Sequence, residues 1–206
     1  MLKIWGRANS TNVKKVLWCA CELGLEFERI DAGGAFGILN ECTYRALNPN
    51  SLIPCIEDNG LVLWESNAIV RYLAARHGIG TLWLEDPARR AVGDKWMDWT
   101  TANLAAPFRD VFVNMIRIPQ AERDEAAVER GLATCGTLLE RVDETLARTP
   151  FLSGMDFGMG DIPLGCYAYA WFEMPITRPD LPHFEAWYQN LRTRSAYAKA
   201  VAIALT

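Results

Sequence analysis

The stretch that decides the fold is NPNSLIPCIEDNGLVLWESNAIVRYL, residues 48–73. It contains two short apolar runs, Ile53–Ile56 and Leu61–Trp64, and the turn between them, Asp58-Asn59-Gly60, is a strong β-hairpin signal. A helical apolar pattern follows directly, from Ser66 to Gly78. The stretch therefore predicts two antiparallel strands followed by a helix.

The residues before this stretch alternate strand and helix signals. Leu2–Trp5 is a short apolar run, and Phe27–Ile30 alternates apolar and charged residues as a half-buried strand does. Between them, Val13–Gly24 has helical spacing and ends on a glycine in a C-cap position. A weaker helix is expected over Asn40–Leu47. Residues 1–80 therefore predict the order β-α-β-α-β-β-α.

The remainder of the chain carries almost no strand signals. Gly78–Pro87 reads as a linker, and long helical patterns follow it. We expect Pro107 to kink one of these helices or to end part of it. Shorter helices are expected at residues 161–172, 182–191 and 195–202. The sequence thus predicts a mixed α/β domain of about eighty residues, followed by an all-helical domain.

Composition excludes several classes of function. The chain has 206 residues, 50% of them hydrophobic, and a formal net charge of −4, so nothing marks it as a protein that binds nucleic acid or an anionic membrane. We recognise no signal peptide, and no apolar run approaches the roughly 20 residues that span a bilayer. The six cysteines are scattered, which is typical of reduced thiols in a cytoplasmic protein.

The sequence predicts no metal site. Cys19 and Cys21 lie inside the first helical pattern, and their spacing fits neither a redox pair nor a zinc knuckle. The only histidines, His77 and His183, have no visible triad partners. Metal chemistry and serine-hydrolase chemistry are therefore set aside.

Pro54 stands at the start of a strand, where a residue without an N–H suits an edge or a turn. Taken alone, the segment favours an ordinary trans bond, because only about 5–6% of X-Pro bonds in folded proteins are cis. A cis Ile53-Pro54 bond would instead turn the backbone of Ile53 outward. Its N–H and C=O would then be free to pair with an extended peptide as an added strand.

Glu65 and Ser66 stand at the start of the helix in the deciding stretch. The free N–H groups and the dipole of a helix start attract a carboxylate, and a glutamate one residue earlier can accept from an ammonium. The pair would suit the head group of an α-amino acid. The alternative is that Ser66 is only an N-cap and that Glu65 is solvated.

The segment Gly6–Val13 is a strand-to-helix turn rich in hydroxyl and amide groups. Lowering a thiol pKa from about 8.5 to about 6.5 needs roughly 2.7 kcal/mol. A hydrogen bond to a charged group contributes about 1.5–3 kcal/mol, and a helix start adds about 0.3–1 kcal/mol. One well-placed hydroxyl, such as that of Ser10, would therefore keep a bound thiol mostly ionised at neutral pH. A serine or threonine that only caps the helix is the alternative.

Together these segments resemble a known family. Residues 48–73, with Gly6–Ser10 and Asn12–Trp18 before them and Asp161-Ile162-Pro163 near a late helix start, are similar to the cytosolic glutathione transferases. The closest resemblance is to bacterial members with an active-site serine, akin to the theta and phi groups. The resemblance covers essentially the whole chain.

The resemblance implies a fold and an activity. The fold is an α/β thioredoxin-like, glutathione-binding domain over residues 1–80 and an all-α domain over residues 87–206, usually as a cytoplasmic homodimer. The activity is that of a detoxifying glutathione S-transferase, which conjugates the thiolate of its co-substrate glutathione to small hydrophobic electrophiles without a metal. The alternatives are a glutathione-dependent peroxidase or disulfide reductase, and a non-catalytic ligand-binding protein on the same fold.

The resemblance also implies roles for individual residues. Ser10 would hold the thiolate with Asn12 near the sulfur, while Thr11 and Asn12 stay alternatives to Ser10 as the residue that activates the thiol. The Ile53 backbone before a cis Pro54 would pair with the cysteinyl unit, Glu65 and Ser66 would hold the γ-glutamyl head, and Asn40 would approach the glycine end. The expected walls of the electrophile pocket are Phe108, Phe112, Met115 and Trp171.

Three positions depart from the family pattern. Ser51 stands where a glycine is usual, Leu52 where some members carry glutamine, and Gly158 where an N-capping box has serine or threonine. Glycine is a tolerable N-cap that costs a few tenths of a kcal/mol. Asp161 can still reach back to the Gly158 N–H, so we expect Asp161 to be structural.

Overall fold

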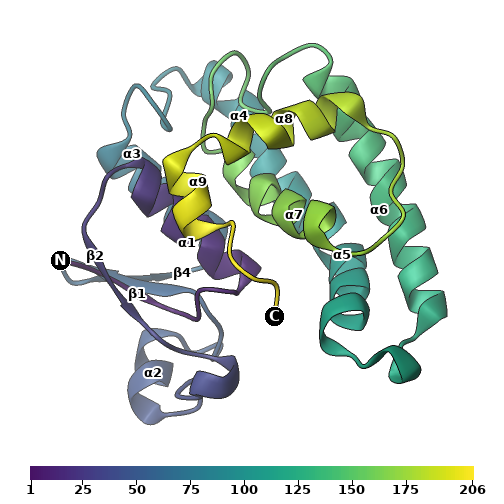
Figure 1. Cartoon of the computed structure of the whole chain (residues 1–206). Helices are drawn as coiled ribbons and strands as arrows, with labels where there is room; N and C mark the ends of the chain where they lie inside the picture. The colour runs from purple at the N-terminus through teal and green to yellow at the C-terminus, as the bar shows by residue number, and fades with distance from the viewer.

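The computed structural model describes all 206 residues (Figure 1). The strands are β1 (Leu2–Trp5), β2 (Phe27–Ile30), β3 (Cys55–Asp58) and β4 (Leu61–Trp64). The α-helices are α1 (Thr11–Glu22), α2 (Cys42–Leu47), α3 (Ser66–His77), α4 (Pro87–Trp99), α5 (Ala105–Phe112), α6 (Glu125–Leu146), α7 (Asp161–Glu173), α8 (Pro182–Arg192) and α9 (Ser195–Ala200). Two 3-10 turns, η1 (Gly34–Phe36) and η4 (Gln120–Glu122), and two π turns, η2 (Thr100–Leu104) and η3 (Val113–Arg117), complete the chain.

The four strands form one mixed sheet in the order β2-β1-β3-β4. β1 and β2 are parallel, whereas β3 is antiparallel to both β1 and β4. Helices α1 and α3 lie on one side of the sheet and α2 on the other (Figure 1). This arrangement confirms the predicted α/β fold class of the N-terminal part. The strand predicted from Ile53 begins only at Cys55, because Pro54 has no N–H to give to the ladder.

Helix α1 is the central element of the molecule. It packs against α3, α7 and α9, and every side chain from Val13 to Ala20 is buried. Its end is a Schellman motif, in which the N–H of Leu25 bonds the carbonyl of Ala20 and the N–H of Gly24 bonds that of Cys21. Gly24 has φ 63°, so the predicted C-terminal glycine takes the left-handed conformation that this motif requires.

The helical part begins with one long segment that Pro107 does not end. Helix α4 runs into η2, α5 and η3 without a break, so residues 87–117 are continuously helical. Proline cannot donate a hydrogen bond to the carbonyl four residues earlier, which here belongs to Asn103. The backbone takes π geometry over Thr100–Leu104 and returns to α geometry at Ala105. The predicted kink or stop is therefore a change of helix type, located just before the proline.

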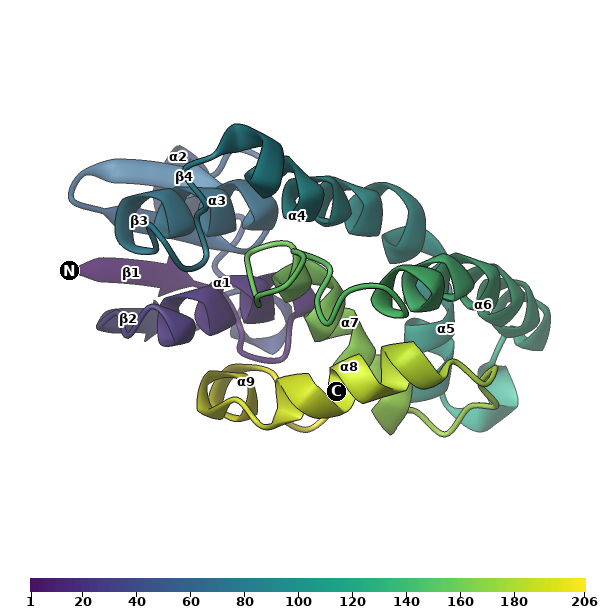
Figure 2. The same cartoon turned by 90° about the horizontal axis from the view of Figure 1, so that it is seen from above.

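One hydrophobic core joins the two parts of the chain. Its 40 buried residues run from Leu2 in β1 to Val201 after α9. Helices α1 and α7 approach closely at Gly165, where a Cβ would lie 2.5 Å from the Trp18 ring. Figure 2 shows the strands at one end of the molecule, α5 and α6 towards the other, and α1 and α7 between them. None of the helices has the length and apolar character needed to cross a bilayer.

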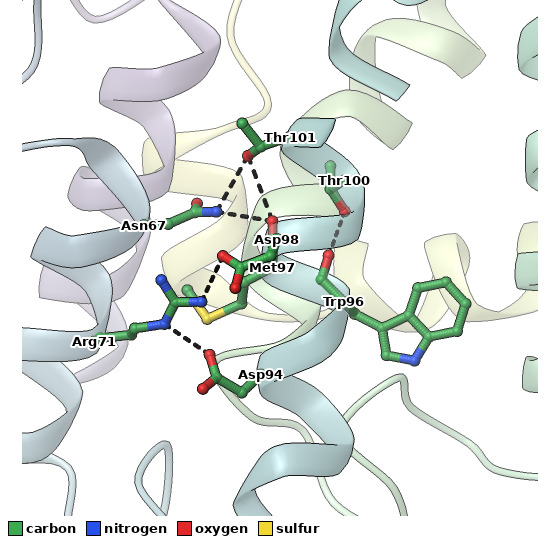
Figure 3. A network of polar contacts seen from close by, with 8 residues as sticks. All are labelled: Asn67, Arg71, Asp94, Trp96, Met97, Asp98, Thr100 and Thr101. Atoms are coloured by element: carbon green, nitrogen blue, oxygen red, sulfur yellow. Dashed lines mark hydrogen bonds and ion pairs between the residues drawn. The ribbon is translucent and has the colours of Figure 1, made fainter. Parts of the chain in front are cut away.

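A polar network fixes α3 against α4 (Figure 3). The guanidinium of Arg71 bonds Asp94 and Asp98, at 2.6 Å each. The side-chain amide of Asn67 donates to the Met97 carbonyl at 2.8 Å and to the Thr101 hydroxyl at 3.2 Å. The N-terminal end of α3, which carries Glu65 and Ser66, is thereby held in a fixed position relative to the helical part.

Asp161 ties the start of α7 to the loop before it. Its buried carboxylate accepts from the N–H groups of Leu152 at 2.8 Å, Ser153 at 3.3 Å and Gly158 at 3.1 Å, and from the Trp187 indole at 3.0 Å. The predicted bond to the Gly158 N–H is confirmed. With four donors inside the core, Asp161 is a structural residue.

Candidate functional site

A cleft of about 300 Å³ opens between the start of α1 and the helices α5 and η3. The β1–α1 loop and the first turn of α1 supply one side, while α5, η3 and α7 supply the other. The lining residues are Arg7, Ser10, Thr11, Asn12, Ala105, Phe108, Arg109, Phe112, Val113, Arg117 and Tyr167. Both parts of the fold therefore contribute to this cleft.

Ser10 lies in the cleft immediately before α1. Its backbone is extended, with φ −78° and ψ 126°, and its side chain makes no capping bond. Its carbonyl accepts from the N–H of Lys14 at 2.8 Å, which starts the helix. The hydroxyl is therefore free at the positive end of α1, where an anion is stabilised. Thr11 and Asn12 line the same cleft, so all three candidates for thiol activation lie together.

The Ile53-Pro54 peptide bond is cis. The N–H and C=O of Ile53 make no hydrogen bond to other backbone groups, because β3 begins two residues later. The preceding carbonyl, that of Leu52, accepts from the Tyr44 hydroxyl at 2.7 Å and from the Asn48 amide at 2.8 Å. The loop is thus fixed at Leu52, while Ile53 presents an unpaired backbone donor and acceptor.

The backbone conformation of Ser51 shows how a serine fits where the family pattern has a glycine. Its φ is 54°, in the left-handed region that glycine adopts without a steric cost. A serine therefore holds here a backbone conformation that glycine adopts more easily. Its N–H bonds the Asn48 carbonyl at 3.1 Å, which helps to hold that conformation.

At the start of α3, the structure corrects the expected N-cap. Ser66 is the first helical residue, and Glu65 occupies the N-cap position without a side-chain cap bond. Glu65 has φ 74°, a conformation that is rare for non-glycine residues and that concentrates at functional sites. The nearly buried Ser66 hydroxyl donates to the Asn12 side-chain oxygen at 3.4 Å. This contact links the start of α3 to the first turn of α1.

Lys15 extends this polar chain into the core, and the sequence reasoning missed it. Lys15 is 1% exposed, and its ammonium group donates to the Ser66 hydroxyl at 3.5 Å. It also lies 5.5 Å from the centre of the Tyr167 ring. Burial lowers the pKa of Lys15 to about 8, and the carboxylate of Glu65 acts in the opposite direction. The sequence feature that indicates a buried lysine is the pair Lys14-Lys15 inside the apolar helical pattern of α1.

Two of the four expected pocket walls lie elsewhere. Phe108 and Phe112 line the cleft, with ring centres 6.2 Å apart. Met115 and Trp171 do not line it. Met115 packs against the core from η3, and Trp171 is buried in α7 beside a separate hollow near Arg178. Both were identified from apolar character alone, which does not distinguish a core side from a cleft side.

Asn40 lies outside the cleft. It borders a shallow neighbouring hollow of about 400 Å³, together with the glycines of the loop that contains η1. Arg7 lies between the two spaces, because a Cβ on Gly34 in that loop would meet the Arg7 side chain at 3.2 Å. Asn40 and Ser10 therefore border two different hollows.

Three arginines of the cleft were not identified from the sequence. Arg7 precedes the first helix, and Arg109 and Arg117 lie eight residues apart on the long helical segment. None of the three forms an ion pair with a carboxylate, and no aspartate or glutamate lines the cleft. Burial and the nearby charge of Arg117 lower the pKa of Arg7. The sequence feature that indicates a shared cationic site is the helical spacing of Arg109 and Arg117, which places both on one face.

Comparisons with known proteins agree on one family. Residues 9–76 match the family model described as glutathione S-transferase, N-terminal domain. The chain is 44% identical over 205 residues to glutathione S-transferase GstB of Escherichia coli K12, covering 98% of this chain and 99% of that protein. It is 31% identical to glutathione S-transferase 3 of Zea mays, covering 98% and 93%. A crystal structure of a theta-class glutathione S-transferase of Xanthomonas axonopodis pv. citri, with glutathione bound, is similar at 56% identity and a TM-score of 0.97, covering 100% and 99%.

Proposed function

The chain belongs to the glutathione S-transferase family, and from this premise we propose that the Ser10 cleft is where the thiolate of bound glutathione attacks an electrophilic carbon. The chain is a transferase with glutathione as its co-substrate, in keeping with the theta-class relative that holds glutathione. The observation that carries the proposed site is the free hydroxyl of Ser10 at the positive end of α1, inside a cleft shared by both parts of the fold.

Glutathione would bind through the Ile53 backbone and the start of α3. The N–H and C=O of Ile53 would pair with the backbone of the cysteinyl unit as an added strand. The γ-glutamyl carboxylate would meet the Ser66 hydroxyl and the free N–H groups at the start of α3. Its ammonium would meet the carboxylate of Glu65. Asn12 supports this site through its contact with Ser66.

The thiol would lie against Ser10, where its ionisation is favoured. The Ser10 hydroxyl donates to the thiolate, and the start of α1 adds its dipole, which together supply the roughly 2.7 kcal/mol that a two-unit fall in pKa needs. The thiol proton leaves to solvent on binding. The thiolate then forms a C–S bond while the leaving group departs with the electron pair of its bond to that carbon.

The test is an ultraviolet titration of the thiolate of bound glutathione across a pH series. We expect a depressed thiol pKa in the wild type that rises by about one to two units in Ser10→Ala, the loss of one charged hydrogen bond. Thr11→Val is the matched control, because it removes a second hydroxyl from the same cleft. A shift in Thr11→Val alone would transfer the role to Thr11. Wild-type protein that binds glutathione with an unshifted thiol pKa would contradict the activated-thiolate mechanism.

We also propose a homodimer. Two large apolar residues are exposed, Leu52 at 62% and Trp64 on the edge strand β4 at 38%. The family resemblance also implies two copies of the chain. Light scattering should give twice the 23.1 kDa of one chain. A mass of one chain at micromolar concentration would contradict the dimer.

We propose a cytoplasmic location. All six cysteines are free of disulfides, and four of them are buried, as suits a reducing compartment. Cell fractionation should recover the protein with cytoplasmic markers. Recovery with a secreted or membrane fraction would contradict this location.

A further inference from the structure

The cleft beside Ser10 is cationic in a protein that is acidic overall. The chain has a formal net charge of −4, yet the cleft is lined by Arg7, Arg109 and Arg117 and by no carboxylate. These residues come from three elements: the β1–α1 loop, α5 and η3. A concave site with positive charge, in a protein whose net charge is negative, attracts anions and concentrates them there.

Contacts hold two of the three guanidinium groups in place, those of Arg7 and Arg117, and none of the three is paired with an aspartate or glutamate. Arg7 donates to the Asn9 side-chain oxygen at 2.6 Å. Arg117 lies 5.2 Å from the centre of the Phe112 ring, so the aromatic wall of the cleft supports the cation. Its Nε and Nη2 both donate to the Thr206 carbonyl, at 3.3 and 3.2 Å. Both bonds end on one oxygen, so a substrate carboxylate that uses these two donors must displace the Thr206 contact.

We propose that the electrophile of this enzyme carries an anionic group, a carboxylate on an apolar or aromatic body, and that Arg109 and Arg117 bind it with Arg7 as the third charge. The body of the substrate would lie against Phe108 and Phe112, with its reactive carbon towards Ser10. This inference rests on the proposed function. It narrows the expected hydrophobic substrate to an amphipathic one, because a neutral apolar molecule would cover three arginines without bringing a negative charge to balance theirs.

The reaction with such a substrate balances without a further reactant. For a chloronitrobenzoate, the glutathione thiolate adds to the ring carbon that bears chlorine and forms the C–S bond. The electron pair moves into the ring and its nitro groups, and it returns as the C–Cl bond breaks and chloride leaves. The carboxylate is not consumed, so its only part is to be bound.

The test compares two electrophiles that differ in charge, 4-chloro-3,5-dinitrobenzoate and its uncharged benzamide. Each value of kcat/KM is divided by the rate constant of the uncatalysed reaction with glutathione. We expect the corrected kcat/KM of the benzoate to exceed that of the benzamide in the wild type. The ratio of the two should fall about tenfold in Arg109→Gln and in Arg117→Gln, which corresponds to about 1.4 kcal/mol for each variant. Arg130→Gln is the matched control, since Arg130 is an exposed arginine on α6 outside the cleft.

Turnover of the benzamide reports folding, because a variant that fails to fold loses both activities. The benzoate rate should also fall as salt is raised from about 0.01 to 0.15 M, while the benzamide rate should not. A corrected ratio of one or less in the wild type overturns the proposal. So does an equal loss on both substrates with a raised KM for glutathione, because the arginines would then serve glutathione itself. Absence of glutathione binding would instead refute the proposed function.

Discussion

Replacing Lys15 with methionine should stabilise the protein, although it removes a side chain from the centre of the molecule. Lys15 is 1% exposed, and the only hydrogen bond of its ammonium group is the 3.5 Å contact to the Ser66 hydroxyl. Methionine has a similar length and shape, carries no charge and suits irregular apolar surroundings. Lys15→Met therefore removes the cost of burying a cation and leaves little empty space.

The magnitude follows from the pKa. Burial lowers the pKa of Lys15 from 10.5 to about 8. A difference of about 2.5 units corresponds to about 3 kcal/mol of destabilisation at neutral pH. The contact with the Tyr167 ring, at 5.5 Å, returns about 0.5–2 kcal/mol. We therefore expect Lys15→Met to raise the free energy of unfolding by about 1–3 kcal/mol at pH 7.

The sign of the pH dependence gives a second check. Between pH 8 and 10.5, the unfolded chain binds more protons at this lysine than the folded chain does, so wild-type stability from this group rises with pH. The advantage of Lys15→Met should be complete below pH 8 and should disappear by about pH 10.5.

The assay is equilibrium unfolding in urea from pH 7 to 10 at a fixed protein concentration, with reductant present. The matched control is Lys199→Met, which removes an exposed lysine from α9 and should leave the free energy of unfolding within about 0.5 kcal/mol of the wild type. A Lys15→Met protein that is less stable at pH 7, or whose difference does not vary with pH, would refute the reasoning. Lower stability at pH 7 would show that the buried charge is net stabilising, and a difference that does not vary with pH would show that folding does not shift the pKa of Lys15.

Three further predictions concern the frame and its thiols. Asp161→Ala should lower the free energy of unfolding in urea by at least about 3 kcal/mol, because it leaves buried N–H donors without an acceptor, and an unchanged midpoint would contradict its structural role. Gly165→Ala should cost about 1–3 kcal/mol and lower the melting temperature, since its Cβ would meet the Trp18 ring; a wild-type melting temperature would mean that α1 and α7 can separate freely. Cys42 is the only exposed thiol of the six, so Cys42→Ser should remove the fast phase of labelling by a disulfide reagent in the native protein, and a fast phase that persists would contradict this assignment.

The elements of the fold could be predicted because their signals are local. The β3–β4 hairpin follows from Asp58-Asn59-Gly60, and the end of α1 follows from Gly24, which needs only its neighbours to form its motif. The errors lie where two local signals compete. The apolar run at Ile53 favoured a strand that Pro54 delays by two residues, and Pro107 suggested a kink that the π turn before it replaces.

The cleft was only partly predictable, because its walls come together in the folded chain. Ser10 and Ser66 were identified from helix starts, which are local features. Arg117 is 110 residues from Arg7 in the sequence, and only the packing of the helical part against α1 brings them into one space. Trp171 was expected in the cleft but is buried in the core. An aromatic residue on a helix can face either the core or a ligand, and only the tertiary packing decides between the two.

The single core that runs from β1 to the end of α9 has a consequence for how this enzyme exchanges its ligands. Because α1 packs against α3, α7 and α9 at once, widening the cleft by rotating one part against the other would expose apolar surface on both sides of that helix. A rotation of one part of the chain against the other is therefore costly. We expect ligands to enter and leave through movements of side chains and of the last residues, where Thr206 contacts Asn9 and Arg117. Ligand exchange in such an architecture relies on small local movements, and mutations that alter it should cluster at the mouth of the cleft.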